Sequence, residues 1–498
     1  MKIRIALALI FLWIGRPPLP AQAAPPDLVL EGKVSGAQNK TYFEVPFDVP
    51  AGIHRISVDF TYTGKENKTA LDLGIADPER FRGNSGGNKT HFTLSEWDAT
   101  PSYLPGPIPA GKWKLLVSVP NIRPSQESTY RAEIRFNSKL EDQSFTLSPL
   151  VNGKRWYRGD LHMHDAHSDG SCASQSGASV PCPLFFTAQN AASRGLDFIA
   201  ITDHNAMSQY DAMRELQPYF DRLLLIPGRE MTTFWGHFNI FGVIEYIDYR
   251  AVARDGRDIN QILREVRAKG GIASINHADS PGGEFCMGCA WEPPTPVDMS
   301  LVTGVEVING GRIFLSSADV WDREIGQGFH LAAIGGSDNH NAPEQAGTPG
   351  AIGWPTTVVE ASELSVAAIM EGIRRGRVFI DLTGSRDRII DLEARDSTEH
   401  DRGDQQWISM GDNIHAAAGD SVTVRVHVAA CPRAAIHLFL DGRETPALPP
   451  LATGIGNETL TSSWTSDGIH HWIRAEVRDA NGSLMLISNP IYINFEAH

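Results

Sequence analysis

The sequence predicts an α/β protein in which a central barrel of alternating strands and helices is flanked by two β-domains. Two patterns lead to this expectation. Apolar side chains alternate with period two over residues 24–150 and again over 396–498, whereas strands alternate with helices over 155–395. The first pattern is typical of β-sandwiches, and the second of a parallel α/β sheet or barrel.

Residues 1–23 have the pattern of a secretory signal peptide. Lys2 and Arg4 form a positive start, an apolar core "IALALIFLWIG" follows, and Ala21-Gln22-Ala23 provides small residues for cleavage. The alternative is an uncleaved membrane anchor, but the apolar core is short for a bilayer span. We expect an exported protein, periplasmic or secreted, with no membrane contact after cleavage.

Residues 24–150 are expected to form an N-terminal β-sandwich. Apolar residues occupy every second position in four stretches, for example Phe43, Val45, Phe47 and Val49. Spacers rich in turn residues, such as "RGNSGGN" and "LPGPIPAG", separate these stretches. This segment contains no dense group of metal-binding or nucleophilic side chains, so we expect the chemistry elsewhere.

Residues 155–395 alternate between helix and strand signals. In "RDINQILREVRAKGG", Asp258 and Gln261 have the spacing of a capping box, and Gly270 marks the helix end. The buried strand "IASINH" follows at once, and "PLFFTAQNAASRG" before "LDFIAITDH" repeats the arrangement. Beyond it, residues 396–498 return to period-two alternation, which predicts a small immunoglobulin-like β-domain.

Composition and cysteine count restrict the class of protein further. The chain has 498 residues, 42% of them hydrophobic and 21% charged, as in soluble globular proteins of two to four domains. A net charge of −15 argues against a nucleic-acid or anionic-membrane partner. The five cysteines leave at least one unpaired; Cys172 can pair with Cys182, and Cys286 with Cys289. The alternative for the CxxC pair is a zinc site, but no second soft pair lies nearby in the sequence.

Histidines and carboxylates follow five of the predicted strands. In a parallel barrel the carboxyl ends of the strands converge on one face, so these side chains should meet although they are far apart in the sequence. Alternate residues of an extended strand point the same way, which lets two of them reach one ion. The candidates, in chain order, are His162, His164, Asp169, His204, Glu230, His237, His277, Asp338 and His340.

This mixture of imidazole and carboxylate is suited to zinc, manganese or iron. Eight or nine ligands exceed what one ion can use, so the pattern predicts at least two metal ions. We expect Asp160 and Asp203, each beside a ligand histidine, to accept hydrogen bonds that orient imidazoles. His167 is expected to be solvated. The alternative for any single histidine is that it is an ordinary polar loop residue with hydrogen-bond partners and binds no metal.

Five motifs resemble, in order, those of the polymerase and histidinol phosphatase (PHP) domain over residues 155–385. They are "DLHMHDAHSDG", "GLDFIAITDHN", "GREMTTFWGHFNIFG", "INHADSPGGE" and "GGSDNH". The tail, with "GRVFIDL" and "SNPIYINF", resembles the exported CehA/McbA family of metallohydrolases within that superfamily. The resemblance implies a distorted seven-stranded (β/α) PHP barrel holding two or three metal ions.

The resemblance also implies how the ligands are divided. His162, His164, Glu230 and Asp338 would hold one ion, and Glu230 would bridge to a second, completed by His277 and His237. A third would lie between Asp169, His204 and His340. Asp169 departs from the histidine that some relatives have there, and His237 follows Glu230 more closely than in some relatives.

These features predict a metal-dependent hydrolase in which a metal-bridging hydroxide attacks the substrate. Asp338 or His204 would pass the proton to the leaving group. Two small-molecule substrate classes stay open, phosphoesters and carbamate or carboxylic esters. Arg229 or Arg375 could neutralise a phosphate, whereas a lining of Phe234, Trp235, Trp291 and Trp354 would favour an aryl ester; both groups also have ordinary structural explanations. The alternative function is a non-catalytic, metal-holding protein that binds a carbohydrate or polymer.

Overall fold

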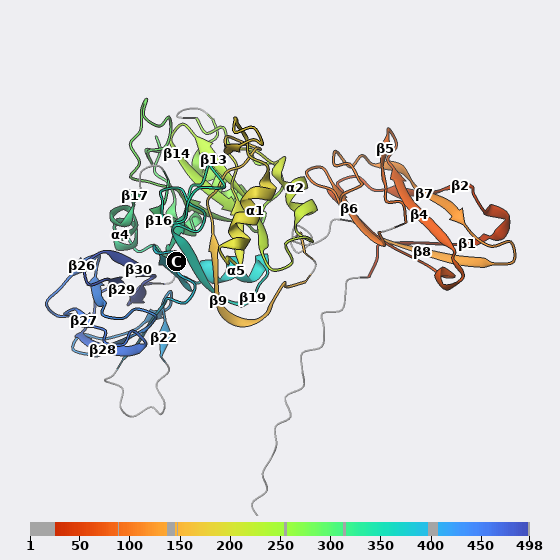
Figure 1. Cartoon of the computed structure of the whole chain (residues 1–498). Coiled ribbons are helices and arrows are strands. Elements are labelled where there is room, and N and C mark those ends of the chain that lie inside the picture. The colour runs from red at the N-terminus through yellow and green to blue at the C-terminus, as the bar shows by residue number, and fades with distance from the viewer. Residues whose placement is uncertain are drawn as a thin grey trace, which may run out of the picture.

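The computed structural model describes residues 25–496, apart from 88, 137–144, 147, 253–255, 312–314 and 397–406. The expected signal peptide lies outside this range. Within it, no helix is long and apolar enough to cross a membrane. The N-terminal part stands to one side of the molecule, and the central and C-terminal parts lie against each other (Figure 1).

The N-terminal part consists of two antiparallel four-stranded sheets, ordered β1-β8-β3-β6 and β2-β7-β4-β5. Alternate residues of β7, including Trp113 and Leu115, are buried between the sheets, while Lys112 and Lys114 point to solvent. The strands are β1 (Leu28–Ser35), β2 (Tyr42–Val49), β3 (Arg55–Tyr62), β4 (Ala70–Ala76), β5 (Phe81–Asn84), β6 (His91–Ser95), β7 (Gly111–Asn121) and β8 (Glu127–Phe136).

The central part contains the five α-helices of the described chain and a mixed sheet. The helices are α1 (Leu184–Ser193), α2 (Gln209–Leu216), α3 (Ile259–Ala268), α4 (Ala318–Gly326) and α5 (Val366–Arg374). The strands are β9 (Asn152–Asp160), β10 (Ser171–Ala173), β11 (Ser179–Pro181), β12 (Phe198–Ile201), β13 (Leu224–Thr233), β14 (Gly236–Phe241), β15 (Ile272–Ile275), β16 (Gly304–Asn309), β17 (Leu315–Ser316), β18 (Ala332–Gly336), β19 (Thr356–Glu363) and β20 (Val378–Asp381).

Helix α3 begins as the sequence predicts. The Asp258 side chain accepts a hydrogen bond from the Gln261 amide, and the Gln261 side chain accepts one from the Asp258 amide. Ile259, Ile262 and Leu263 are buried against the sheet. The capping box and the apolar stripe therefore fix both the start and the orientation of this helix.

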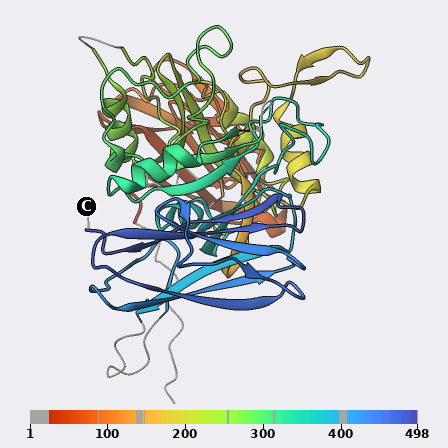
Figure 2. The same ribbon diagram turned by 90° about the vertical axis from the view of Figure 1, so that its left-hand side faces the viewer.

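The C-terminal part adds a second layer beneath the central one (Figure 2). A four-stranded sheet, β22-β21-β24-β28, buries Val422, Val424 and Val426 against Ile436 and Ile473 of the facing strands. The strands are β21 (Ile389–Asp396), β22 (Ile408–Ser409), β23 (Asn413–Ile414), β24 (Ser421–Ala429), β25 (Ala435–Leu440), β26 (Arg443–Glu444), β27 (Leu451–Ala452), β28 (Glu458–Thr465), β29 (His471–Arg478), β30 (Leu484–Ser488) and β31 (Ile491–Ile493).

The facing strands belong to the same large sheet as the central strands. β20 pairs with β30, so that Phe379 lies opposite Ser488. Asn489 then accepts a hydrogen bond from the Ala333 amide and donates to the carbonyls of Ala333 and Val378. The C-terminal strands are therefore a continuation of the central sheet, which closes on itself.

The expected fold class, an α/β protein with a distorted seven-stranded (β/α) PHP barrel flanked by two β-domains, is wrong, because the structure does not contain the helix-rich barrel. The structure is 41% strand and 12% helix. β14 pairs antiparallel with both β13 and β15, and β19 pairs antiparallel with β9 and β20. The reason is that hairpins and loops make several connections for which a barrel needs crossover helices. For example, "EMTTFWGHFNIF" folds back on itself at Gly236, whose φ of +139° suits glycine.

Candidate metal centre

The parallel pairs of the sheet bring the predicted ligands to one edge. β12 lies between β9 and β13, and β16 between β15 and β18, all paired in parallel. The segments that leave these strands stay in register, because Met163 pairs with Asn339, and His204 with Glu230, through isolated parallel bridges. The carboxyl ends of parallel strands share one edge, so the expected convergence survives although the barrel does not.

Glu230 lies at the centre of the cluster. Its carboxylate is buried and faces five imidazoles, and Asn276 donates a hydrogen bond of 2.9 Å to its Oε1. The nearest approaches are 2.7 Å to His204 Nδ1, 3.2 Å to His237 Nδ1, 3.4 Å to His277 Nε2, 3.5 Å to His162 Nε2 and 3.6 Å to His164 Nε2. One carboxylate among so many nitrogens is suited to bridging two cations.

Asp338 provides a second carboxylate, which faces the same Nε2 atoms of two of these imidazoles as Glu230 does. Its Oδ1 lies 3.3 Å from both His162 Nε2 and His164 Nε2. Asp338 has a φ of +51° and His277 a φ of +28°, both in the left-handed region that residues other than glycine rarely adopt. Strain of this kind, typically about 1–3 kcal/mol, is concentrated at functional sites.

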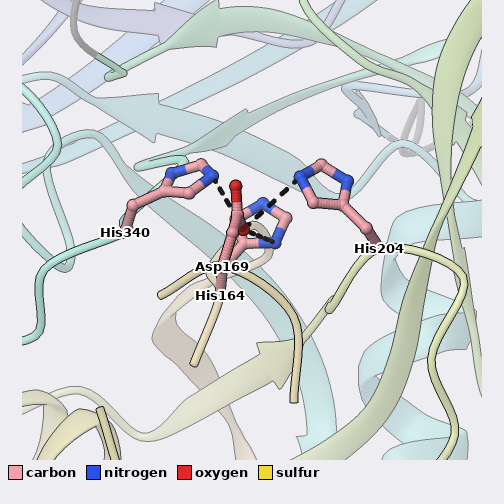
Figure 3. Close-up of side chains that lie close together, drawn as sticks. All are labelled: His164, Asp169, His204 and His340. Atoms are coloured by element: carbon pink, nitrogen blue, oxygen red, sulfur yellow. Dashed lines mark ion pairs between the residues drawn. The ribbon is translucent and has the colours of Figure 1, made fainter. Parts of the chain in front are cut away.

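Asp169 forms an outer cluster with three histidines at the mouth of the site (Figure 3). Its Oδ1 lies 3.4 Å from His340 Nε2, 3.6 Å from His204 Nε2 and 3.9 Å from His164 Nδ1. The Asp169 side chain is 57% exposed, whereas that of His164 is fully buried. All nine predicted ligands therefore lie in one continuous cluster, with Asp169 and His340 nearest to solvent.

The spacing of the donor atoms is consistent with bound cations. Separations of 3.3–3.6 Å between Nε2 atoms and carboxylate oxygens are longer than hydrogen bonds. Two ligands each about 2.1 Å from a tetrahedral zinc ion lie about 3.4 Å apart. Several buried nitrogen atoms, including His162 Nε2, His164 Nε2 and His237 Nε2, have no hydrogen-bond partner in the described chain.

Four overlapping sets of these residues can hold a metal ion. Within each set, the ligand atoms all lie within 4.8 Å of one another. The sets are His162, His164 and Glu230; His162, His277 and Asp338; His164, Asp169, His204 and His340; and His237, His277 and Cys289.

Mutual attraction between imidazoles and carboxylates dominates the electrostatics. Burial alone would raise the pKa of Glu230, but the facing imidazoles of His204 and His162 hold it well below its usual range. Burial opposes protonation of His162, yet the carboxylates of Glu306 and Asp338 raise its pKa well above the ordinary value. Without a cation, protons on the histidines balance the carboxylates, and a metal ion must displace them.

The histidines of the outer cluster differ from one another. Burial and the charge of His340 lower the pKa of His164 to about 4, so this imidazole is neutral at pH 7 and free to bind a cation. Burial works against protonation of His340 too, but the hydrogen bond with Asp169 and the charge of Asp338 raise its pKa to about 9.

Glu306 is a functional residue that the sequence analysis missed. It lies on β16, is buried, and its Oε2 is 2.9 Å from His162 Nδ1. This contact fixes the ring so that Nε2 points at Glu230 and Asp338. The available signal was a lone acid in the otherwise uncharged strand "GVEVIN".

Replacing Glu306 by Gln is expected to weaken metal binding by about 10–100-fold, the usual effect of losing a carboxylate that orients a ligand histidine. Titration of metal-free protein with Zn²⁺ against a competing chelator measures the change. Glu324→Gln, on the partly exposed helix α4, is the matched control and should bind like the wild type. Equal affinities of both variants would mean that Glu306 does not orient His162.

Neither Asp160 nor Asp203 accepts a hydrogen bond directly from an imidazole, contrary to expectation, and Asp203 reaches His164 Nδ1 only through the Ser168 hydroxyl. Asp160 accepts hydrogen bonds from the backbone amides of Ser337, Gly353 and His162. Asp203 accepts from the Asp165 amide and the Ser168 hydroxyl. Both carboxylates instead hold the loops that carry the ligands.

Asp165 is a further buried acid beside Asp203; burial and that neighbour raise its pKa to about 8. His167 lies outside the ligand sets, and its Nδ1 is 2.8 Å from the Ser208 hydroxyl.

A cavity of about 960 Å³ opens onto the cluster. His277, Asp338, His340 and Asp169 form its inner side. Loops closed by the two expected disulfides, Cys172–Cys182 and Cys286–Cys289, form its walls, while Cys431 is free and buried. Among the described residues, no lysine or arginine lines this cavity.

The two candidate arginines lie elsewhere. Arg229 is buried and donates to the Glu245 carbonyl, while the exposed Arg375 lies 4.0 Å from Glu371. Of the candidate aromatics, Trp235 and Trp291 pack against the hydrophobic core, and Trp354 packs over Gly384. Phe234 is 84% exposed. On the loop that carries Cys286, Phe285 is 69% exposed and Met287 is 80% exposed, and Phe285 lines the cavity.

Comparison with known proteins adds little to this description. No family model and no curated protein matches the sequence. The crystal structure of PsfC from Pseudomonas syringae PB-5123 is similar over 42% of this chain and 83% of its own, with 15% identity and a TM-score of 0.27. The CARDB domain of PF1109 from Pyrococcus furiosus is similar over 22% of this chain and 97% of its own, with 14% identity and a TM-score of 0.14. Likenesses this slight assign neither fold nor activity.

Proposed function

We propose that the chain is an exported, metal-dependent hydrolase that cleaves a phosphoester or a carbamate or carboxylic ester. The observation that carries the proposal is the convergence of Glu230 and Asp338 on the histidines at ligand-to-ligand spacing. The resemblance of the motif order to that of PHP metallohydrolases supports the same chemistry. The proposed chemistry does not require a (β/α) barrel, because the candidate ligands also meet at the edge of the mixed sheet.

Two or three divalent ions, zinc, manganese or iron, are proposed for the cluster. The inner ion would be held by His162, His164, Glu230 and Asp338, and a second by Glu230, His237 and His277. A third would lie between Asp169, His204 and His340 at the more exposed end. Such ions supply Lewis acidity and lower the pKa of bound water towards neutrality.

Other side chains of the protein would orient the ligand histidines and transfer protons. Glu306 and Thr232 hold the rings of His162 and His204 through their Nδ1 atoms. Asp338, which lines the cavity, would take a proton from an attacking water and return it to the leaving group. His204 is the other candidate for this transfer, since its ring is 28% exposed.

The residues that line the cavity indicate how each class of substrate would be bound. Since the described lining lacks lysine and arginine, neutralising a phosphate would fall to the metal ions. The exposed side chain of Phe285 at one wall offers contact to an apolar leaving group. Both ester classes remain within the proposal.

The test is a screen of metal-loaded protein against bis(p-nitrophenyl) phosphate, p-nitrophenyl phosphate and 1-naphthyl esters and carbamates. Metal content is measured on the same sample. We expect turnover of at least one substrate, its loss after dialysis against a chelator, and its return with Zn²⁺ or Mn²⁺. Full metal content without turnover across the panel would favour a binding protein instead.

A further inference from the structure

Cys289 lies beside two of the candidate metal ligands. Ligand atoms of His237, His277 and Cys289 all lie within 4.8 Å of one another, and all three residues are buried. His277, Cys286 and Cys289 also line the cavity. The described structure therefore places a sulfur atom at the edge of the proposed second metal site.

The loop that carries Cys289 is fixed to both histidine-bearing segments. The Trp291 amide donates to the Ala278 carbonyl, next to His277, and the Glu292 amide donates to the Trp235 carbonyl, close to His237. Gly288 packs so tightly on the Thr233 carbonyl that a side chain at that position would collide with it. These contacts hold the backbone on both sides of Cys289 against the segments that carry the two histidines.

Both imidazoles have donor capacity that the described protein leaves unused. His237 Nδ1 and His277 Nε2 face Glu230, while His237 Nε2 and His277 Nδ1 are buried without a hydrogen-bond partner in the described chain. A disulfide sulfur is a poor ligand, whereas a thiolate with two imidazoles is a favoured ligand set for zinc. The ability of His237, His277 and Cys289 to bind a metal ion together therefore depends on whether the Cys286–Cys289 disulfide is formed or reduced.

We propose that the Cys286–Cys289 disulfide is a redox gate on the metal centre. When it is reduced, Cys289 becomes a thiolate ligand that shares an ion with His237 and His277; when it is oxidised, that ligand is withdrawn. The inference rests on the proposed function insofar as it uses the same metal centre.

The reductant is a dithiol. One of its thiolates attacks the Cys286 sulfur, the bond between the two cysteines breaks, and Cys289 leaves as a thiolate. The second thiol of the reductant then displaces Cys286, which leaves with a proton, and the reductant ends as a disulfide. Cys286 is only half-buried, and its neighbours Phe285 and Met287 are exposed, so the sulfur is within reach of a reductant.

Cobalt(II) provides the test because a Co²⁺–thiolate bond gives a near-ultraviolet charge-transfer band that nitrogen and oxygen ligands do not. Metal-free protein is loaded with Co²⁺ alone, before and after treatment with dithiothreitol, which is then removed by gel filtration under argon. We expect no band in the oxidised protein and a band in the reduced protein.

Two variants separate Cys289 from the other cysteines. Cys286→Ser leaves Cys289 without its partner and should show the band with no reductant, whereas Cys289→Ser should lack the band in either state. Circular dichroism checks that both variants fold. The comparison of oxidised with reduced wild-type protein does not depend on the folding of either variant. A band that persists in Cys289→Ser, or none in reduced wild type and Cys286→Ser, would overturn the proposal.

The same samples distinguish this inference from the proposed function. If Co²⁺ binds and supports hydrolysis but gives no thiolate band, only the redox gate fails. If Co²⁺ does not bind in any state, the metal centre itself is wrong and both proposals fail.

Discussion

Replacing Glu230 by Gln is expected to abolish hydrolysis and to lower metal occupancy while the fold is kept. The substitution preserves the size of the side chain but removes the charge that faces five imidazoles. Metal ions supply several kcal/mol of transition-state stabilisation, so kcat/KM should fall by about 10³-fold or more. Steady-state kinetics and elemental analysis of the purified variant measure both effects.

Glu371→Gln is the matched control, because this glutamate is 57% exposed on α5 and contacts no predicted ligand. It should have wild-type activity and metal content, and far-ultraviolet circular dichroism should be the same for both variants. An E230Q protein that keeps both full occupancy and full turnover would show that the centre is not built around this carboxylate.

Replacing Asp98 by Ala is expected to lower the free energy of unfolding by about 3–5 kcal/mol, because two buried cations lose their counter-charge. Asp98 is fully buried between Arg55 of the N-terminal sheets and Arg214 of α2. These arginines hold the pKa of Asp98 below its usual value in spite of burial. Denaturant unfolding followed by circular dichroism measures the loss.

Asp48→Ala is the control for this substitution. Asp48 pairs with Lys112 at 3.0 Å, but the side chains are 75% and 72% exposed, so the loss should stay below about 1 kcal/mol. Equal losses for Asp98→Ala and Asp48→Ala would mean that the buried pairs do not hold the N-terminal part against α2.

The candidate site was more predictable from sequence than the fold around it. His162, Glu230, His277 and Asp338 could be grouped because each lies on or just after a predicted strand. Parallel pairing joins β9 to β13 through β12 and β15 to β18 through β16, and the antiparallel strand β14 joins the two groups. The connections could not be predicted in the same way. Apolar residues on both faces of "HFNIF" are compatible with a strand in either a parallel or an antiparallel pair.

The sequence did not single out Glu306, and it singled out Cys289 only as a disulfide partner or as part of a CxxC zinc site. Neither follows a strand together with a histidine. Their positions beside His162 and beside His237 and His277 are created only by folding. The left-handed backbone at Asp338 and His277 is likewise set by the packing of the centre and not by residue type.

The pairing of β20 with β30 ties the sheet that carries the candidate metal ligands to the tail of the chain. A truncation before Ile389 would strip the partner from the edge of β20 and leave the amide of Ala333 and the carbonyl of Val378 without Asn489. Bare strand edges recruit other chains, so such a fragment would aggregate before it could be assayed. The C-terminal strands thus complete the sheet that carries the candidate metal ligands, and they are not expected to be exchangeable as an independent module.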